Sequence, residues 1–330
     1  MTIQILIGDD YQDAVRHLAC WERLRDHTVN VLAHAPAAAA DVLLEQVEAL
    51  VLIRERSCVD EALLRRMPRL RLVSQTGKIA AHIDLAACTA HGVAVAEGIG
   101  SPVAPAELTW ALVMAASRRL PDYQRALHAG NWQRMGDPDL GRALHKLTLG
   151  IWSYGKIGRR VAAYGRAFGM DVRVWGSEAS RAQAQTDGYA AFESRAQLFE
   201  HSDVLSLHRR LVEATRHEVD AEDLARMKPD ALLVNSSRAE LIAPGALLAA
   251  LDAGRPGQAA IDVFEHEPLL DTSDRLLRHP RVLATPHLGY VEAGSYAMYF
   301  GAAFDNVLAF AAGKPQAIVN PEVLTTLSWR

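Results

Sequence analysis

The sequence predicts an α/β protein built from two doubly wound parallel sheets. Short apolar runs rich in β-branched residues alternate with stretches that suit helices, and this alternation occurs twice, once before residue 100 and again from Leu147 onward. Such alternation is typical of parallel strands joined by helices that cover both faces of the sheet. The 330 residues, half of them hydrophobic, are enough for two domains of ordinary size or one large α/β domain.

The two alternating regions differ in their number of expected strands. The first region is predicted to form the strands Ile3–Ile7, Val29–Leu32, Leu50–Ile53, Leu72–Ser74 and Val93–Val95, with a helix over residues 60–67. The second is predicted to form the strands Leu147–Trp152, Val172–Trp175, Val204–Leu207, Ala231–Val234, Ala259–Val263 and Val282–Ala284, and the helices Ile157–Phe168 and Gly245–Leu251. A last helix is expected over residues 292–312.

A helix and a polar segment separate the two regions. Ser101 suits a helix N-cap and Pro102 suits the first helical position, and the apolar stretch after them ends near Ser117. The segment that follows is polar and contains Trp132. We predict that residues 101–146 form a helix followed by an arm.

Composition excludes several classes of protein. The net charge is −4, from 35 basic and 39 acidic side chains, so nothing indicates binding to nucleic acid or to an anionic membrane. Three cysteines without a CxxC pair argue against a disulfide framework and a structural zinc site, and no metal is expected. The N-terminus lacks the basic region of a signal peptide, and no apolar run is long enough to span a bilayer. We therefore expect a cytoplasmic protein.

A glycine-rich turn follows the first strand of the second region. The dinucleotide fingerprint has glycines at its first, third and sixth positions, which here are Ser153, Gly155 and Gly158. The third position lets the backbone approach a pyrophosphate, and the following helix N-terminus favours phosphate. The predicted contacts in this turn are Ser153, Tyr154, Gly155, Lys156, Ile157 and Gly158.

The choice between NAD and NADP stays open at the end of the next strand. An acidic residue there accepts from the ribose 2′-hydroxyl in NAD-dependent proteins, but this chain has Gly176. Ser177, Glu178 and Arg181 lie close by: Glu178 can replace the missing acid for NAD, and Arg181 can meet the 2′-phosphate of NADP. His208 and Ser236 are further expected cofactor contacts.

Four other segments resemble the D-isomer-specific 2-hydroxyacid dehydrogenases, in particular their phosphoglycerate dehydrogenase-like and glyoxylate/hydroxypyruvate reductase-like branch. The segments are Asn235–Ile242, Ala260–Pro268, Thr285–Gly289, and Ser74–Lys78 followed by Ile83–Leu85. The resemblance implies that the chain transfers a hydride between a nicotinamide cofactor and a small D-2-hydroxy acid or 2-keto acid.

The resemblance also implies roles for individual residues. Arg238 binds the substrate carboxylate and polarises its carbonyl, His287 is the acid/base, Glu267 pairs with His287, and Asp262 contacts the nicotinamide end of the cofactor. These residue types suit the chemistry, because an unperturbed histidine titrates near pH ~6.5, a neighbouring carboxylate orients it, and a guanidinium forks onto a carboxylate. The implied substrate contacts are Arg54 and the loop residues Thr76, Gly77 and Lys78.

Three expectations about architecture and function follow from the same resemblance. Residues 1–100 and 290–330 form a substrate domain, with a dinucleotide-binding domain of residues 101–289 inserted between them, so that both domains are Rossmann-like. Subunits pair through residues 101–146 into a homodimer. The alternative function is that of a cofactor-sensing, corepressor-like binding module without significant turnover.

Overall fold

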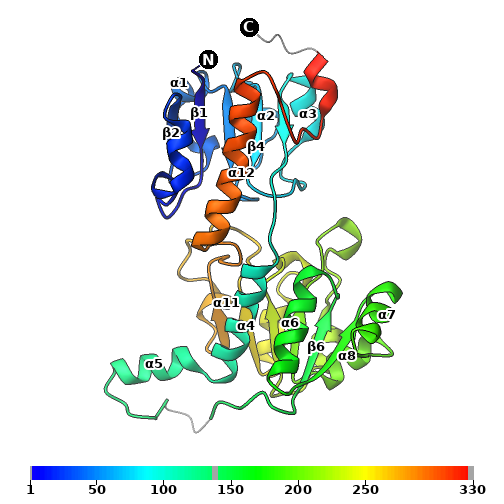
Figure 1. Ribbon diagram of the computed structural model, residues 1–330. Helices are drawn as coiled ribbons and strands as arrows, with labels where there is room; N and C mark the ends of the chain where they lie inside the picture. The colour runs from blue at the N-terminus through cyan, green and yellow to red at the C-terminus, as the bar shows by residue number, and fades with distance from the viewer. Residues whose placement is uncertain (1, 136–139, 326–330) are drawn as a thin grey trace. The chain divides into compact units, whose positions relative to one another are not determined.

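The computed structural model describes residues 2–135 and 140–325, which leaves out residues 136–139 of the predicted arm and both ends of the chain. The chain divides into two compact units. Unit 1 consists of Met1–Ser101 and Glu292–Arg330, and unit 2 consists of Pro102–Val291. The chain therefore enters unit 2 after Ser101 and returns to unit 1 after Val291 (Figure 1).

Unit 1 contains a five-stranded parallel sheet in the order β2-β1-β3-β4-β5. The strands are β1 (Gln4–Ile7), β2 (Thr28–Val31), β3 (Ala49–Leu52), β4 (Leu72–Gln75) and β5 (Ala94–Ala96). The helices are α1 (Asp41–Leu44), α2 (Glu61–Arg65), α3 (Leu85–Ala90) and α12 (Ala293–Ala311), with short 3-10 segments at Val15–His17, Ala19–Leu24, Pro36–Ala38 and Pro321–Thr325. All five predicted strands are confirmed, each with ends within one residue of the prediction.

Helices cover both faces of the sheet in unit 1, and the strands β1, β3, β4 and β5 are therefore largely buried, whereas the edge strand β2 is not. Leu44 of α1 and Leu63 of α2 belong to the same buried cluster as Leu50 and Val73 of the sheet. Helix α12 packs on β4 from the other side, where the Ser74 hydroxyl donates to the Ala303 carbonyl at 3.0 Å (Figure 1). The final predicted helix is thus confirmed as part of unit 1.

Unit 2 contains a seven-stranded parallel sheet in the order β12-β11-β10-β9-β6-β7-β8. The strands are β6 (Thr148–Trp152), β7 (Asp171–Trp175), β8 (Ala190–Ala191), β9 (Val204–Leu207), β10 (Leu232–Asn235), β11 (Gln258–Ile261) and β12 (Val282–Ala284). The helices are α4 (Val103–Ser117), α5 (Leu120–His128), α6 (Lys156–Ala167), α7 (Glu178–Thr186), α8 (Arg195–His201), α9 (Ala221–Arg226), α10 (Ala246–Asp252) and α11 (Arg275–Arg278), with 3-10 segments at Glu213–Thr215 and Ala239–Leu241.

The period of two along each strand divides the core of unit 2 into two layers. Leu232 and Val234 belong to a buried cluster with residues of α4 and α6. Leu233 belongs to a second cluster with residues of α8, α9 and α10. Because helices cover both faces, the sheet is doubly wound, and the predicted α/β class with two parallel sheets is confirmed.

The arm after α4 contains a helix that the sequence did not predict. The segment has the polar composition of a loop, and none of the residues of α5 is buried, although the segment is helical. Within unit 2, α5 stands away from the sheet (Figure 1). At the start of α4, Pro102 is the N-cap and not the first helical residue, so the helix begins one residue later than predicted. In the described part of the chain, no helix combines the length and the apolar character needed to cross a bilayer.

Candidate active site

The predicted residues of unit 2 lie at one edge of its sheet. Parallel strands have their carboxyl ends on the same edge, and ligands of open α/β sheets bind there, where the strand order reverses. In this sheet the order reverses at β6, whose neighbours are β7 and β9. The predicted residues follow the strands in this way: Gly155 after β6, Gly176 after β7, His208 after β9, Ser236 and Arg238 after β10, Asp262 and Glu267 after β11, and His287 after β12.

His287 and Glu267 are in direct contact. The distance between His287 Nδ1 and Glu267 Oε2 is 2.5 Å, and Glu267 Oε1 accepts a hydrogen bond from the Phe264 amide at 2.9 Å. The carboxylate thus has one oxygen fixed by the backbone and the other on the imidazole. A ring whose Nδ1 is held by a carboxylate has Nε2 left for a reacting group. The His287 side chain is 23% exposed, so solutes can reach the ring.

Asp262 organises the loop that carries His287. Its carboxylate is fully buried and accepts from the Thr285 hydroxyl at 2.6 Å and from the amides of Leu288 and Gly289 at 2.7 and 2.9 Å. Burial raises the pKa of Asp262, and these hydrogen bonds oppose that rise. The carboxylate thus accepts from three donors of its own chain, and the contact of Asp262 with the nicotinamide end of the cofactor, which the family resemblance implies, stays a prediction.

Arg238 lies in a loop that is fixed by a buried amide side chain. Asn235, at the end of β10, donates from Nδ2 to the Arg238 carbonyl at 2.8 Å and accepts from the Ser237 amide at 3.1 Å. Arg238 Nη1 donates to the Ser237 carbonyl at 2.6 Å. The neighbouring Ser236 hydroxyl is 2.6 Å from the hydroxyl of Thr109 in α4. Arg238 and His287 therefore follow β10 and β12, with β11 between them.

The glycine-rich turn has the shape that a pyrophosphate requires. Ser153 adopts a positive φ of 81°, the conformation that the usual first glycine provides. A Cβ at Gly158 would overlap the Ser153 carbonyl, whereas a Cβ at Gly155 would meet no heavy atom within 4 Å. No side chain caps α6, so its first amides face the open space over Gly155. The turn fits a dinucleotide, although the Tyr154 side chain is buried with its hydroxyl on Asp187 at 2.9 Å.

The end of β7 carries a guanidinium where NAD-dependent proteins have an acid. Arg181 Nη1 donates to the Gly176 carbonyl at 2.9 Å, and its Cζ lies 4.6 Å from the centre of the Trp175 ring. Ser177 caps α7 by accepting from the Ser180 amide at 3.3 Å. Glu178 is exposed in the first turn of the same helix.

Burial lowers the pKa of His208 to about 4. An unperturbed histidine titrates near ~6.5, so the folded protein binds this proton more weakly than the unfolded chain does. The stabilising contribution is complete above about pH 6.5 and is lost as the pH falls towards about 4.

We expect His208→Gln to weaken the acid sensitivity of the apoprotein. Between about pH 7 and pH 5 the wild type should lose about 2 kcal/mol of unfolding free energy through this group, and the variant should keep it. Urea titrations of both proteins at the two pH values measure this difference. Equal losses in the two proteins would contradict the assignment.

In unit 1, the structure brings three of the predicted substrate residues together. A Cβ at Gly77 would lie 2.7 Å from Arg54 Cζ, so the guanidinium lies against the glycine. The Thr76 hydroxyl accepts from the Arg54 amide at 2.9 Å. The Thr76 amide itself donates to the Leu52 carbonyl at 3.0 Å, whereas the amides of Gly77 and Lys78 have no acceptor among the described residues.

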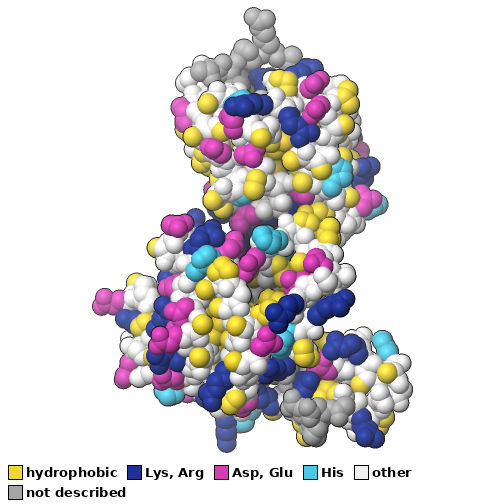
Figure 2. Space-filling model, turned by 180° about the vertical axis from the view of Figure 1, so that it is seen from behind, with side chains coloured by type: hydrophobic (Ala, Val, Ile, Leu, Met, Phe, Trp, Pro, Cys, Tyr) yellow, Lys and Arg dark blue, Asp and Glu magenta, His cyan; other side chains and the backbone are white. Residues whose placement is uncertain are grey.

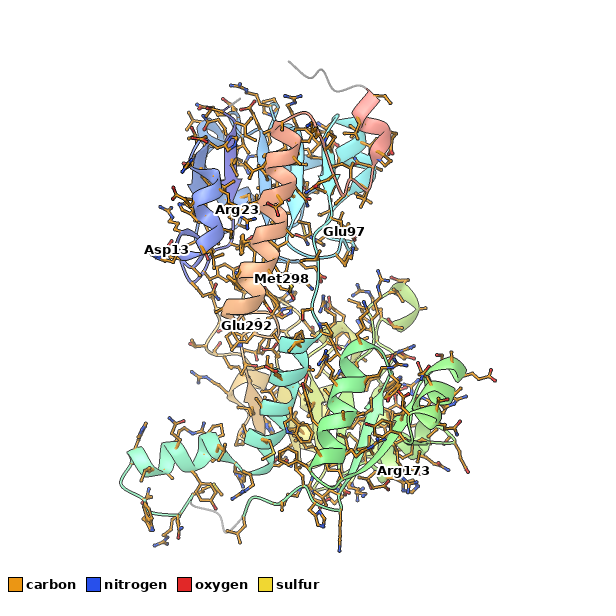
Figure 3. The ribbon with its side chains drawn as sticks, in the orientation of Figure 1. Asp13, Arg23, Glu97, Arg173, Glu292 and Met298 are labelled. Carbon is orange, nitrogen blue, oxygen red and sulfur yellow. The ribbon has the colours of Figure 1, made fainter. Side chains whose placement is uncertain are left out.

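Lys78 has a partner that the sequence did not indicate. Its ammonium group is bonded to the carboxylate of Glu97. Glu97, which is labelled in Figure 3, follows β5. The other oxygen of Glu97 accepts from the Ile79 amide at 3.1 Å. Glu97 thus binds both the Lys78 side chain and the Ile79 amide, which fixes the loop. The charge of Lys78 is compensated within unit 1. Glu97 lies 19 residues further along the chain, so no local pattern in the sequence could have revealed the pair.

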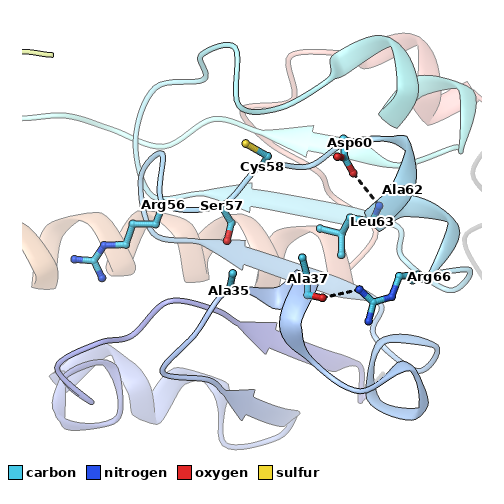
Figure 4. Close-up of a pocket in the computed structure, with 9 residues that line it drawn as sticks. All are labelled: Ala35, Ala37, Arg56, Ser57, Cys58, Asp60, Ala62, Leu63 and Arg66. Carbon is cyan, nitrogen blue, oxygen red and sulfur yellow. Dashed lines mark hydrogen bonds between the residues drawn. The ribbon is translucent and has the colours of Figure 1, made fainter. Parts of the chain in front are cut away.

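A cavity of about 260 Å³ in unit 1 includes none of the predicted substrate residues (Figure 4). Arg66 donates from Nη1 to the Ala37 carbonyl at 2.6 Å, and Asp60 caps α2 by accepting from the Leu63 amide at 2.9 Å. These charged groups serve the fold. The lining residues are Ala35, Ala37, Arg56, Ser57, Cys58, Asp60, Ala62, Leu63 and Arg66.

Comparison with known proteins matches most of unit 2 to a protein family. Residues 110–289 match the NAD binding domain of the D-isomer specific 2-hydroxyacid dehydrogenases. A glyoxylate reductase from Aeropyrum pernix is 36% identical over 273 residues, which cover 81% of each chain.

Solved structures agree with this relation over nearly the whole chain. A phosphoglycerate oxidoreductase from Vibrio cholerae is 52% identical with a TM-score of 0.90, over 94% of this chain and all of that one. A D-lactate dehydrogenase from Aquifex aeolicus, solved with NAD and lactic acid, is 27% identical with a TM-score of 0.78, over 98% of both chains. The matched region, the identities and the coverage together show that this chain belongs to the D-isomer specific 2-hydroxyacid dehydrogenase family and is an oxidoreductase that uses a nicotinamide cofactor.

Proposed function

We propose that the chain reduces a small 2-keto acid to the D-2-hydroxy acid, and catalyses the reverse oxidation, with His287 as the acid/base. The contact between His287 Nδ1 and Glu267 carries the proposal, because it holds Nδ1 and leaves Nε2 for a reacting oxygen. In reduction Nε2 gives its proton to the carbonyl oxygen, and in oxidation it takes the proton of the hydroxyl group. When bound, the cofactor supplies or receives the hydride. Arg238 binds the substrate carboxylate and polarises the carbonyl.

A panel of 2-keto acids tests this proposal. We expect the purified protein to consume NADH or NADPH with at least one of glyoxylate, hydroxypyruvate, phosphorylated hydroxypyruvate (the phosphorylated keto acid) or a branched keto acid. Binding of the cofactor without turnover of any of them would instead support the corepressor-like alternative, which no observation among the described residues favours.

We further propose that the chain accepts NADP through Arg181. The guanidinium lies at the end of β7, where Gly176 replaces the acid that would repel a 2′-phosphate. Charge-assisted hydrogen bonds contribute about 1.5–3 kcal/mol, or roughly ten- to a hundredfold in affinity.

Two variants distinguish the cofactor alternatives. We expect Arg181→Ala to lower kcat/KM for NADPH by roughly ten- to a hundredfold and to change the value for NADH little. Glu178→Gln is the matched variant, because it lowers the NADH value if Glu178 binds the ribose hydroxyls. Steady-state kinetics with both cofactors decide between them, and a selective loss with NADH in Glu178→Gln alone would overturn the NADP assignment.

The arm supports a homodimer. Large apolar side chains on α5 and the segment after it are exposed, with Leu120 at 55%, Leu127 at 54% and Trp132 at 75%. Figure 2 shows hydrophobic and basic side chains on the surface of unit 2. Exposed apolar side chains gathered on one segment mark interaction sites. We propose that two copies pair through residues 101–146.

The oligomeric state in solution tests the arm. We expect the mass of a dimer from light scattering at micromolar concentration. Trp132→Glu combined with Leu127→Glu should shift the protein towards the monomer, because like charges would meet in the apolar contact. A monomeric wild type would contradict the proposal.

We also propose that Arg54 binds the far end of the substrate. Its guanidinium lies against Gly77, next to the two amides left for a carboxylate. An arginine at this place favours a substrate with a second anionic group, such as a dicarboxylic or phosphorylated keto acid.

A further inference from the structure

Arg54 has a backbone conformation that its neighbours impose. Its φ is 55°, in the left-handed region that residues other than glycine rarely adopt. The Arg54 amide donates to the Thr76 hydroxyl at 2.9 Å, and the Arg54 carbonyl accepts from Gln75 Nε2 at 2.8 Å. Strained residues persist where the surroundings over-determine them. The side chains of Gln75, at the end of β4, and of Thr76 therefore hold Arg54 in the turn after β3.

This backbone conformation determines where the guanidinium lies. Arg54 Cζ is 5.7 Å from the centre of the Tyr299 ring, and the group also lies against Gly77. A side chain at position 77 would overlap it. A change in the φ of Arg54 would swing the side chain away from this loop, because the Cα–Cβ direction follows the backbone.

Gln75 can hold Arg54 only in one amide orientation. Gln75 is fully buried, and its Nε2 lies 2.8 Å from the Arg54 carbonyl and 2.9 Å from His82 Nε2. The opposite orientation would place Oε1 against the Arg54 carbonyl, where two acceptors repel. With the amide in this orientation Gln75 Nε2 donates to His82 Nε2, which requires the ring tautomer with its proton on Nδ1.

One feature sets Gln75 apart from ordinary core residues. Gln75 Oε1 is buried and has no hydrogen-bond partner among the described residues, which costs stability. A buried amide kept at such a cost indicates a task other than packing. The His82 backbone is fixed in turn, since its carbonyl accepts from the Val59 amide at 2.8 Å.

We propose that Gln75 and His82 are positioning residues that hold Arg54 in its substrate-binding orientation. This inference rests on the proposed role of Arg54 at the far end of the substrate. His82 Nε2 accepts one N–H of the Gln75 amide and so directs the other N–H to the Arg54 carbonyl. The pair sets the affinity for substrates with a second anionic group and does not touch the reacting carbon.

Kinetics with two substrates test the pair. The phosphorylated keto acid has a second anionic group, and glyoxylate lacks one. We expect Gln75→Leu to raise KM for the phosphorylated substrate by about three- to tenfold, with kcat and the KM for glyoxylate within about twofold of wild type. Gln75→Glu should raise the same KM further, because a carboxylate oxygen would face the Arg54 carbonyl.

Variants of His82 keep the test independent of the buried position. His82→Gln offers an acceptor oxygen and should stay close to wild type, whereas His82→Phe offers none and should match Gln75→Leu. An unchanged KM in both Gln75→Leu and His82→Phe, or an equal loss with both substrates, would overturn the inference.

Arg54→Ala separates this inference from the proposed function. If Arg54→Ala raises KM for the phosphorylated substrate by roughly ten- to a hundredfold and the Gln75 and His82 variants do not, Arg54 binds substrate but the pair does not position it. If Arg54→Ala leaves both KM values unchanged, the proposed role of Arg54 is wrong and the inference is overturned with it.

Discussion

Replacing His287 with alanine should lower kcat for keto acid reduction by about 10²–10⁴-fold, because a positioned acid/base contributes that much to a proton transfer. Cofactor binding should be nearly unchanged, since the ring is held by Glu267 and not by the glycine-rich turn. Steady-state kinetics and cofactor fluorescence titration measure the two effects separately.

Glu267→Gln serves as the matched control for His287. The amide keeps the size of the side chain, and its oxygen can still accept from Nδ1–H, but the negative charge beside the ring is lost. We expect an intermediate loss of kcat, smaller than in His287→Ala. A His287→Ala variant with wild-type turnover would remove the acid/base from the account.

Replacing Arg238 should have the second large effect. We expect Arg238→Ala to lower kcat/KM for every 2-keto acid by about 10²–10⁴-fold, because two charge-assisted hydrogen bonds of roughly 1.5–3 kcal/mol each are lost. Arg238→Lys keeps the charge but not the fork, so it should recover only part of the loss.

The dependence on substrate distinguishes Arg238 from Arg54. All 2-keto acids share the carboxylate and the carbonyl, so the loss in Arg238→Ala should be similar for glyoxylate and for the phosphorylated keto acid. A loss confined to the phosphorylated substrate would place Arg238 at the far end and contradict its assignment.

The strands could be predicted because buried strands are apolar, and an apolar run can be recognised in the local sequence. The apolar run Ala231–Val234 predicts a strand, and the structure has β10 at Leu232–Asn235, with all four residues buried. Helix α5 was missed for the opposite reason, since none of its residues is buried and its polar composition resembles a loop. Hydrophobic periodicity finds elements through the core that they join, and α5 joins none within this chain.

The site was predictable in its residue types and less so in its partners. The pair of His287 and Glu267 followed from the family resemblance, and the structure brings the two into contact. The pairing of Lys78 with Glu97 and the occupied carboxylate of Asp262 depend on residues that meet only in the fold. The positive φ of Ser153 agrees with its place at the first position of the fingerprint, where glycine is usual.

Transfer of deuterium tests whether the chain moves a hydride between the nicotinamide and C2 of a 2-keto acid. The purified protein is given a 2-keto acid and reduced cofactor that carries deuterium at the transferring position of the nicotinamide, and the product is analysed for configuration and label. We expect the wild type to form a D-2-hydroxy acid with deuterium at C2, and His287→Ala to form almost none. A product of L configuration, or one without deuterium at C2, would contradict it.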